Sequence, residues 1–226
     1  MIVVVPEVLN PAELKQIRDS LTDGDFLDGR GTAGARTKGV KQNLQTDRRS
    51  DRLSSLQALI LAALDRNGLF KTAIAPRRIV PPRFNLYKPG MHYGDHVDNA
   101  IMGDAGDPIR IDCSFTLFIS EPGEYEGGEL IIRSGYGPAS FRLPAGHLVA
   151  YPTYFYHEVT PVQRGERLAC VSWLQSMIRD PVKREIILDL ALASDRVSAG
   201  GGPTAKDALA FLDKARKNLL RQWIET

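Results

Sequence analysis

The sequence predicts a mainly β (α+β) fold of the jelly-roll, or double-stranded β-helix, type, with helices before it and a helical hairpin after it. Beyond Arg78 and as far as Trp173, short strand-like runs alternate with turn residues. Helical spacing of apolar residues is confined to the two ends of the chain. The run Arg110–Ser120 alternates most regularly, with apolar side chains at every second position: Ile111, Cys113, Phe115, Leu117 and Ile119.

The first helix is predicted from the residues at its start. Residues 3–5 are three valines and predict a short strand. Asn10 is a good N-cap, Pro11 fits the first turn, and Glu13 stands at the capping-box position. Apolar residues follow at helical spacing, which predicts a helix from this point: Leu14, Ile17 and Leu21.

A second helix is predicted for Ser50–Asn67, because its leucines and isoleucine form one stripe. Gly68 is expected to end this helix. Between the two helices, Asp23–Gly39 is rich in Gly, Asp, Arg and Thr and has no periodicity, which predicts a long loop. Two interpretations of this loop stay open, a flap that covers a substrate and plain disorder.

The strand-like runs number about eight, which is enough for two facing sheets of the jelly-roll type. We assign residues 1–178 to this domain, together with the helices that precede it. The runs are Pro82–Tyr87, Arg110–Ser120, Glu129–Arg133 after Gly127-Gly128, a run at Phe141, His147–Tyr151, Tyr156–Thr160 and Arg167–Trp173.

Residues 179–226 predict a helical extension. Asp180-Pro181 begins a helix that runs to about Asp195, and the Gly-rich stretch Ser198–Pro203 reads as a linker. Thr204 is then expected to cap a last helix with several apolar side chains. This hairpin could pack on the sandwich or form the contact of a homodimer, and the sequence does not distinguish the two.

Composition excludes several classes of protein. The formal net charge of +2 and the scattered basic residues leave no patch for nucleic acid. No stretch approaches the length of a membrane span, and residues 1–6 lack the features of a signal peptide. Cys113 and Cys170 lie in apolar runs, which favours buried free thiols in a reducing cytoplasm, with a disulfide as the alternative. We therefore expect a cytoplasmic protein.

The stretch from Tyr87 to Asp98 carries the strongest functional signal. It ends in His96-Val97-Asp98, and on a strand the side chains of His96 and Asp98 would point to the same side. His157, in a later strand-like run, is the best candidate for a third ligand. Two imidazoles and one carboxylate on one face of a metal are typical of non-haem Fe(II) oxygenases.

The other two histidines fit this pattern less well. His92 and His96 are four residues apart, but Pro89, Gly90 and Gly94 break any helix there. The glutamate of a zinc-protease motif is also absent, so we reject that interpretation. His147 is expected to be a packing or hydrogen-bonding residue at the start of a strand.

Arg167 follows His157 by ten residues and lies in the apolar context Leu168–Val171. We predict that the turn Pro161–Gly165 folds the strand of His157 back on that of Arg167 in an antiparallel hairpin, which would bring Arg167 near the metal. A planar guanidinium can bind the far carboxylate of a dicarboxylate co-substrate through two parallel hydrogen bonds.

These residues, with Tyr87, Gly90, Tyr93 and the run Gly127–Leu130, resemble the Fe(II)/2-oxoglutarate dioxygenases of the prolyl-4-hydroxylase-like class. The sequence is most similar to the bacterial PKHD-type hydroxylases associated with iron uptake, and the resemblance covers nearly the whole chain. It implies that His96, Asp98 and His157 bind Fe(II) and that Arg167 binds 2-oxoglutarate. It also implies a hydrogen bond from Tyr87 to the same carboxylate, O2 as co-substrate, and dependence on ascorbate.

Two functions remain open. The first is a hydroxylase that oxidises a protein residue or a small molecule and releases succinate and CO2. The second is a non-enzymatic iron-binding or iron-sensing protein of the jelly-roll type, which would have no use for Arg167. Demethylation of nucleic acid is disfavoured by the near-neutral charge. No residue names the primary substrate, and a link to iron homeostasis follows from the resemblance alone.

Overall fold

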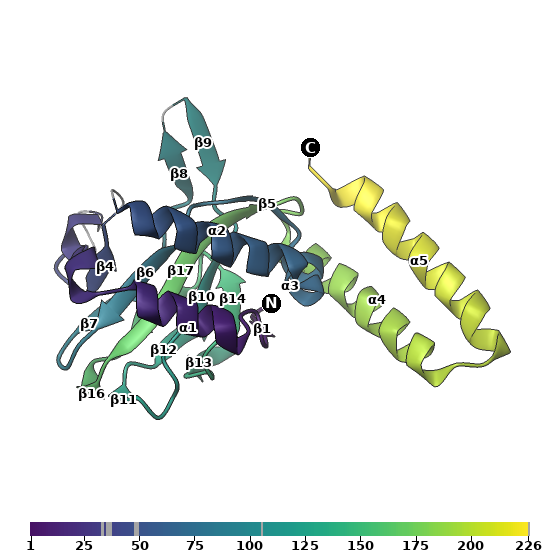
Figure 1. The fold of residues 1–226 in the computed structure, drawn as a ribbon. Helices are drawn as coiled ribbons and strands as arrows, with labels where there is room; N and C mark the ends of the chain where they lie inside the picture. Colours follow the sequence, from purple (N-terminus) through teal and green to yellow (C-terminus); the bar gives the residue numbers. More distant parts are fainter. Residues whose placement is uncertain (33, 35–37, 48–49, 105, 226) are drawn as a thin grey trace.

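A computed structural model of the chain describes residues 1–32, 34, 38–47, 50–104 and 106–225. Its centre is a sandwich of two antiparallel sheets, which confirms the predicted jelly-roll architecture (Figure 1). The larger sheet has the order β1-β14-β10-β17-β6-β4-β2, and β5 also pairs with β17. Its strands are β1 (Val3–Val5), β2 (Phe26–Asp28), β4 (Leu44–Thr46), β5 (Pro76–Ile79), β6 (Arg83–Tyr87), β10 (Cys113–Phe118), β14 (Leu148–Pro152) and β17 (Arg167–Ser176).

The smaller sheet has the order β13-β12-β15-β7-β3. Two further antiparallel pairs stand outside both sheets, the hairpin of β8 with β9 and the pair of β11 with β16. The bounds of these strands are β3 (Lys41–Gln42), β7 (His92–His96), β12 (Leu130–Ser134), β13 (Gly137–Phe141), β15 (Tyr156–Val159), β8 (Ile101–Asp104), β9 (Asp107–Arg110), β11 (Tyr125–Gly127) and β16 (Val162–Gly165).

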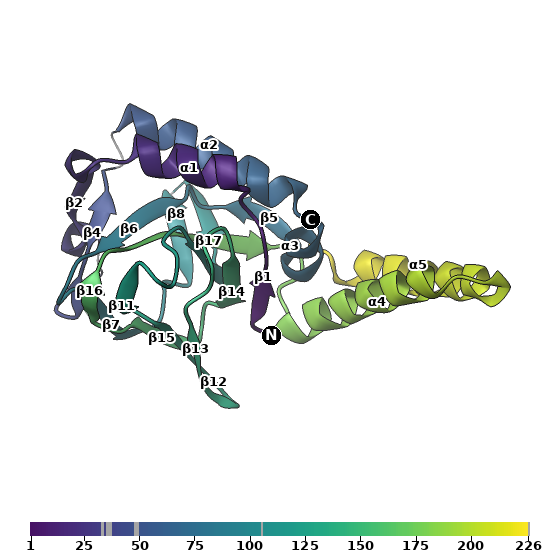
Figure 2. The ribbon, with the colours of Figure 1, turned by 60° about the horizontal axis from the view of Figure 1, so that its bottom comes forward.

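Three helices cover the outer face of the larger sheet: α1 (Pro11–Ser20), α2 (Asp51–Arg66) and α3 (Gly68–Ile74) (Figure 2). As predicted, Asn10 and Glu13 form a capping box at the start of α1. Side chains on the outer face of the sheet, such as Phe84 and Phe115, are buried in one core with those of the helices. The inner face contributes instead to a second core between the two sheets.

The predicted alternation along β10 is correct, but both of its faces are buried. Phe115 and Leu117 belong to the core under the helices. Ser114 and Thr116 point the other way and are also buried, because that face lies between the sheets. A polar row inside a sandwich is costly unless it has hydrogen-bond partners or ligands. This row therefore marks the side of the sheet on which a functional site is expected.

Two predictions for the N-terminal part are wrong. The segment 23–39 is not a continuous loop, because it contains two short 3-10 helices, Asp23–Asp25 and Gly29–Thr32, and strand β2, which pairs with β4. Part of the proposed flap, residues 33 and 35–37, lies outside the described residues. The helix predicted for residues 50–67 does end here, since α2 stops at Arg66, but Gly68 is not a left-handed cap and instead begins α3. Asn67 ends α2 and also caps α3, its side chain accepting a hydrogen bond from the Phe70 N–H.

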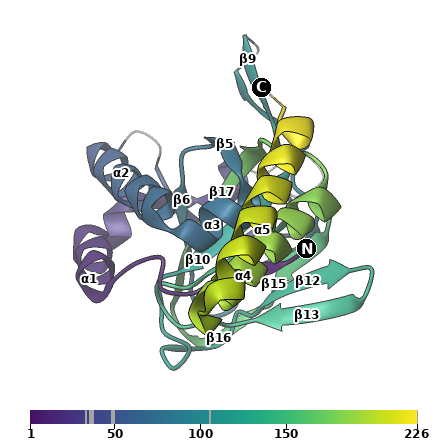
Figure 3. The same cartoon turned by 90° about the vertical axis from the view of Figure 1, so that its right-hand side faces the viewer.

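The C-terminal helices form the predicted hairpin, α4 (Pro181–Gly200) and α5 (Pro203–Trp223), with a shorter connection than the sequence suggested. The hairpin projects from the side of the sandwich (Figures 1 and 2), and it faces the viewer in Figure 3. Its base packs on the sandwich through a small apolar cluster that includes Ile178, Ile187 and Trp223. Farther out, Phe211 is 72% exposed.

Two other expectations are addressed by the structure. Cys113 and Cys170 are buried free thiols, and the disulfide alternative is not formed. None of the helices that the structure describes is both long enough and apolar enough to cross a lipid bilayer.

Candidate metal and co-substrate site

The structure brings His157 together with His96 and Asp98, which lie about 60 residues earlier in the sequence. One ligand atom from each lies within 4.8 Å of the others. The Nε2 atoms of His96 and His157 lie 3.8 Å and 3.5 Å from the Asp98 carboxylate oxygens. Both imidazoles are buried. Two imidazole nitrogens and one carboxylate oxygen at these separations can hold one divalent metal ion between them.

The pairing of β7 with β15 places the two imidazoles side by side, because His96 and His157 are directly opposite residues. The sequence predicted that Asp98 lies on the same strand as His96. This is wrong, because β7 ends at His96. Its carboxylate instead reaches across to the larger sheet, where it accepts a 2.7 Å hydrogen bond from the Ser114 hydroxyl. The expected clustering of His96 and Asp98 is therefore present, but strand alternation alone does not produce it.

Backbone carbonyls fix the tautomer of both imidazoles. Nδ1 of His96 lies 2.8 Å from the Gly94 carbonyl oxygen, and Nδ1 of His157 lies 3.0 Å from that of Phe155. A carbonyl oxygen can only accept, so each Nδ1 carries the proton and donates it. Each Nε2 then presents its lone pair to the centre of the cluster, as metal-bound histidines require.

The protonation of His96 also favours a metal. Burial and the nearby His157 lower the pKa of His96 to about 4. The imidazole is therefore neutral at neutral pH, and a metal does not have to displace a proton from it. Tyr93 stacks on the same ring, with 3.7 Å between ring centroids, and helps to hold its orientation.

Ser114→Ala is expected to weaken Fe(II) binding by about ten- to a hundredfold, because the Asp98 carboxylate would lose the donor that orients it. Isothermal titration of the metal into the anaerobic protein would measure the change. Ser134→Ala is a matched control, since the Ser134 hydroxyl contacts the Gly137 carbonyl in a hairpin remote from the cluster. If Ser114→Ala bound Fe(II) as tightly as the parent protein, the Ser114 hydroxyl would not be needed to position Asp98.

Arg167 lies on the sheet opposite the two histidines. The predicted hairpin between its strand and that of His157 is wrong, because β15 pairs with β12 and β7, whereas β17 pairs with β10, β6 and β5. The chain between β15 and β17 forms β16, which pairs with β11 outside both sheets. Arg167 and the two histidines therefore belong to different sheets of the sandwich.

The guanidinium of Arg167 is buried without a counter-ion. The residue is 1% exposed, and its Nε and Nη2 atoms have no hydrogen-bond partner. No carboxylate of the described chain lies within 4.0 Å of it. The guanidinium instead lies over the rings of Tyr87, at 5.2 Å, and Phe118, at 5.4 Å. A buried unpaired cation is costly, so this position is suited to an anionic ligand.

Tyr87 is the residue directly opposite Arg167 on β6. It is buried, and burial raises the pKa of its phenol, an effect that the nearby Arg167 partly offsets. The hydroxyl therefore stays protonated and can donate a hydrogen bond. Tyr87 also lines the cavity that contains the metal cluster, so the predicted pair of donors, guanidinium and phenol, is close together in the fold.

Gly128 is a residue of this site that the sequence signalled only as part of the Gly127–Leu130 run. It has a φ of +65°, and an added Cβ would lie 3.0 Å from Cδ of Arg167 and 3.0 Å from Val162. We expect Gly128→Ala to cost about 1–2 kcal/mol in unfolding free energy, because an L side chain is strained there. It should also weaken 2-oxoglutarate binding by displacing Arg167.

Denaturant unfolding and co-substrate titration would measure these two effects of Gly128→Ala. Gly123→Ala is the control, because an added Cβ there would meet nothing within 4 Å and the φ is not left-handed. Unchanged 2-oxoglutarate affinity in Gly128→Ala would mean that the arginine does not depend on this close approach.

A cavity of about 700 Å³ surrounds the metal cluster and opens toward the β8–β9 pair. Its walls include residues that the sequence did not single out, notably Lys41, Gln45, Asn85, Arg83 and Trp173. Lys41 and Gln45 lie on strands of only two and three residues, which are too short to show a periodic pattern in the sequence. His92 and His147 are not among the residues that line it.

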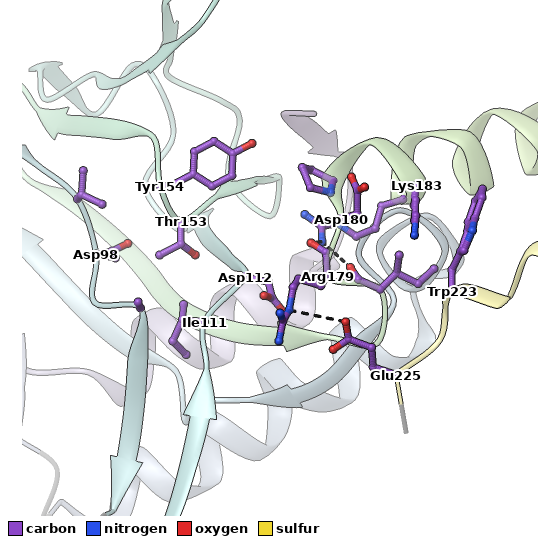
Figure 4. Close-up of a pocket in the computed structure, with 15 residues that line it drawn as sticks. Asp98, Ile111, Asp112, Thr153, Tyr154, Arg179, Asp180, Lys183, Trp223 and Glu225 are labelled. Atoms are coloured by element: carbon purple, nitrogen blue, oxygen red, sulfur yellow. Dashed lines mark hydrogen bonds and ion pairs between the residues drawn. The ribbon is translucent and has the colours of Figure 1, made fainter. Parts of the chain in front are cut away.

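A second cavity, of about 500 Å³, lies between the sandwich and the base of the C-terminal hairpin. Thr153 and Tyr154 line it on one side, and Lys183 and Trp223 line it on the other (Figure 4). Glu225 closes one end through an ion pair with Arg179. The segment Val97-Asp98 borders both cavities, so the hairpin is close to the metal cluster.

The fold and the site define a class of protein, the Fe(II)- and 2-oxoglutarate-dependent oxygenases. Residues 82–175 match the family model of the 2OG-Fe(II) oxygenase superfamily. A solved prolyl-4-hydroxylase of Pseudomonas putida has a similar fold, with a TM-score of 0.53 over 77% of this chain and 92% of that chain, at 21% identity.

Relatives that match over their full length identify the family within this superfamily. The chain is 45% identical to a PKHD-type hydroxylase of Synechococcus elongatus over 225 residues, with all of both chains covered. It is also 45% identical to a PKHD-type hydroxylase of Xanthomonas euvesicatoria over 231 residues, again with full coverage. The chain belongs to the PKHD-type hydroxylases and is an enzyme. The family implies Fe(II) as the metal and 2-oxoglutarate and O2 as co-substrates, which confirms the resemblance stated from the sequence.

Proposed function

We propose that this protein hydroxylates a C–H bond of its primary substrate, with Fe(II) held by His96, Asp98 and His157 and 2-oxoglutarate held by Arg167. The observation that carries the proposal is the pair of complementary features in one interior. Three ligand atoms are gathered on one side, and a buried guanidinium without a counter-ion lies on the opposite sheet. A metal that chelates one end of a dicarboxylate and a cation for its other end account for both.

The chemistry supplied by the bound metal, 2-oxoglutarate and O2 is oxidative: one oxygen atom enters the substrate as a hydroxyl, and the other enters succinate as CO2 is released. The protein's own residues bind, orient and exclude water. The carbonyls of Gly94 and Phe155 keep both imidazoles in the metal-binding tautomer. Arg167 neutralises the distal carboxylate and Tyr87 donates to it, in a part of the interior closed to solvent.

Arg167 also separates this proposal from an iron-binding or iron-sensing protein without catalysis. Such a protein needs the three metal ligands but gains nothing from a buried cation that has no partner. Together with the membership in a hydroxylase family, this supports catalysis over sensing.

The decisive experiment has two stages. Fe(II) and 2-oxoglutarate are added to the protein without oxygen, and a weak visible charge-transfer band is expected. Admission of O2 should then yield succinate in proportion to the 2-oxoglutarate consumed, slowly in the absence of a primary substrate and faster with the correct one. A metabolite and peptide screen that reads succinate release would identify that substrate. Absence of both the band and succinate would refute the proposal.

The remaining features of the proposal follow from the same site. Ascorbate would keep the iron ferrous, and a role in iron homeostasis would follow from the family. The buried thiols Cys113 and Cys170 suit a reducing, cytoplasmic setting. We further propose residues 1–178 as the catalytic domain and residues 179–226 as an extension. The exposed Phe211 on that extension is available for contact with a second copy in a homodimer.

A further inference from the structure

Lys41 is a buried lysine in the wall of the metal cavity, and the proposed chemistry does not use it. It lies on β3, directly opposite Tyr93 of β7, and is 5% exposed. Its ammonium lies 5.2 Å from the centre of the Tyr93 ring, which in turn stacks on His96. A lysine is seldom buried to this extent unless it is paired. Its position beside a metal ligand therefore requires an explanation.

Lys41 begins a chain of buried hydrogen bonds along the cavity wall. Its Nζ donates to the Thr32 hydroxyl at 2.9 Å, which donates to the Gln45 side-chain oxygen at 2.7 Å. The Gln45 amide donates in turn to the Asn85 side-chain oxygen at 2.7 Å. The chain holds the ammonium in place, and among the described residues it accounts for one of the three N–H groups. This part of the wall is therefore a fixed donor surface.

The two cations of the described cavity wall, Lys41 and Arg83, are not in direct ion pairs. Within the described part of the chain, no carboxylate lies within 4.0 Å of Lys41 or of Arg83, whose guanidinium lies over the Trp173 ring at 5.6 Å. Apart from Asp98, which belongs to the metal cluster, the lining contains one carboxylate, that of Asp104 on β8, and it is exposed. Burial lowers the pKa of the Lys41 ammonium to about 8, so it remains charged at neutral pH.

We propose that Lys41 binds a carboxylate of the primary substrate and that the enzyme acts on an acidic compound or an acidic residue. This inference rests on the proposed function, because Arg167 is reserved for 2-oxoglutarate and, among the lining residues that the structure describes, Lys41 and Arg83 are then the remaining lysine and arginine side chains. The bound carboxylate would accept hydrogen bonds from the remaining N–H groups of Lys41, next to the Tyr93 ring that stacks on His96. The carbon to be hydroxylated would therefore lie close to the acid group.

The test uses the anaerobic protein with Fe(II) and 2-oxoglutarate bound, so that Arg167 is occupied and no turnover takes place. A Trp223→Phe background leaves Trp173, in the cavity wall, as the single tryptophan. Its fluorescence reports the binding of four probes, butyrate against butyramide and an acetylated Ala-Glu-Ala amide against its Ala-Gln-Ala counterpart. Preference for butyrate indicates a small-molecule acid, and preference for the glutamate peptide indicates an acidic residue of a protein.

We expect at least one acid to bind roughly ten- to a hundredfold more tightly than its amide, since a buried hydrogen bond to a charged group has this effect. Lys41→Met should abolish the preference, and Lys41→Arg should retain most of it. Lys38→Met, which removes the same charge from an exposed position in the same segment, should behave as the parent protein.

Equal binding of acids and amides, no binding of any probe, or an undiminished preference in Lys41→Met would overturn the inference. The charge-transfer band, recorded first in each variant, separates the two proposals. Its absence from the parent protein would refute the proposed function. Its loss in Lys41→Met alone would instead assign Lys41 to 2-oxoglutarate and overturn the substrate role.

Discussion

Arg167→Met is expected to weaken 2-oxoglutarate binding by about thirty- to several-thousandfold, the usual effect of removing one partner of a buried charge pair. Fe(II) binding should change little, because the three ligands lie on and beside the smaller sheet and Arg167 lies on the larger one. The fold should tolerate the change, since methionine fills a similar volume and removes a buried cation that has no partner. Anaerobic titration of 2-oxoglutarate, followed by the charge-transfer band, would measure the effect.

Arg164→Met is the matched control for this prediction. Arg164 lies three residues earlier in the chain, is exposed, and pairs with Glu126 on the neighbouring strand. Its replacement should leave 2-oxoglutarate affinity unchanged. If Arg167→Met bound 2-oxoglutarate as tightly as Arg164→Met, the co-substrate would have to be held by another group, and the assignment of Arg167 would be wrong.

His157→Ala is expected to lower Fe(II) affinity by more than about a hundredfold, because loss of a ligand exceeds the effect of losing a group that only orients one. The charge-transfer band and succinate formation should disappear together at ordinary iron concentrations. Added imidazole should restore part of the band, since the substitution leaves a cavity of the right shape beside the Phe155 carbonyl. Titration of Fe(II) without oxygen, with and without imidazole, would measure both effects.

His147→Ala serves as the control here. The His147 ring lies outside the cavity, with Nδ1 3.4 Å from the Ala145 carbonyl oxygen, and it is not part of the cluster of ligand atoms. Its replacement should leave iron binding intact. Retention of the band in His157→Ala without imidazole would remove this histidine from the proposed ligand set.

Much of the fold could be predicted, because its elements have local signals. The capping box at Asn10 and the alternation along β10 depend on residues close in sequence, and both are present in the structure. Strands of two or three residues, such as β3 and β4, have too few positions to show any period. For the same reason the stretch between residues 23 and 39 looked like a loop, although it contributes a strand to the larger sheet.

Part of the site could also be predicted from the sequence, and part could not. Histidine is rare in this chain, with four residues, so the order His96, Asp98, His157, Arg167 was informative, and the structure gathers the first three into one cluster. The route by which Arg167 reaches the interior could not be predicted, because it depends on which sheet each strand joins. Lys41 was not singled out, since a lysine between Val40 and Gln42 has no sequence feature that indicates burial.

The division of the site between two sheets has a consequence for selectivity. The two histidines lie on one sheet and Arg167 lies on the other, and facing sheets in such sandwiches are about 10 Å apart. The separation between the two histidines and the guanidinium is therefore set by the packing of the two sheets. With the proposed ligand set and Arg167 as the second anchor, we expect a keto-diacid one carbon shorter or longer than 2-oxoglutarate to bind less tightly.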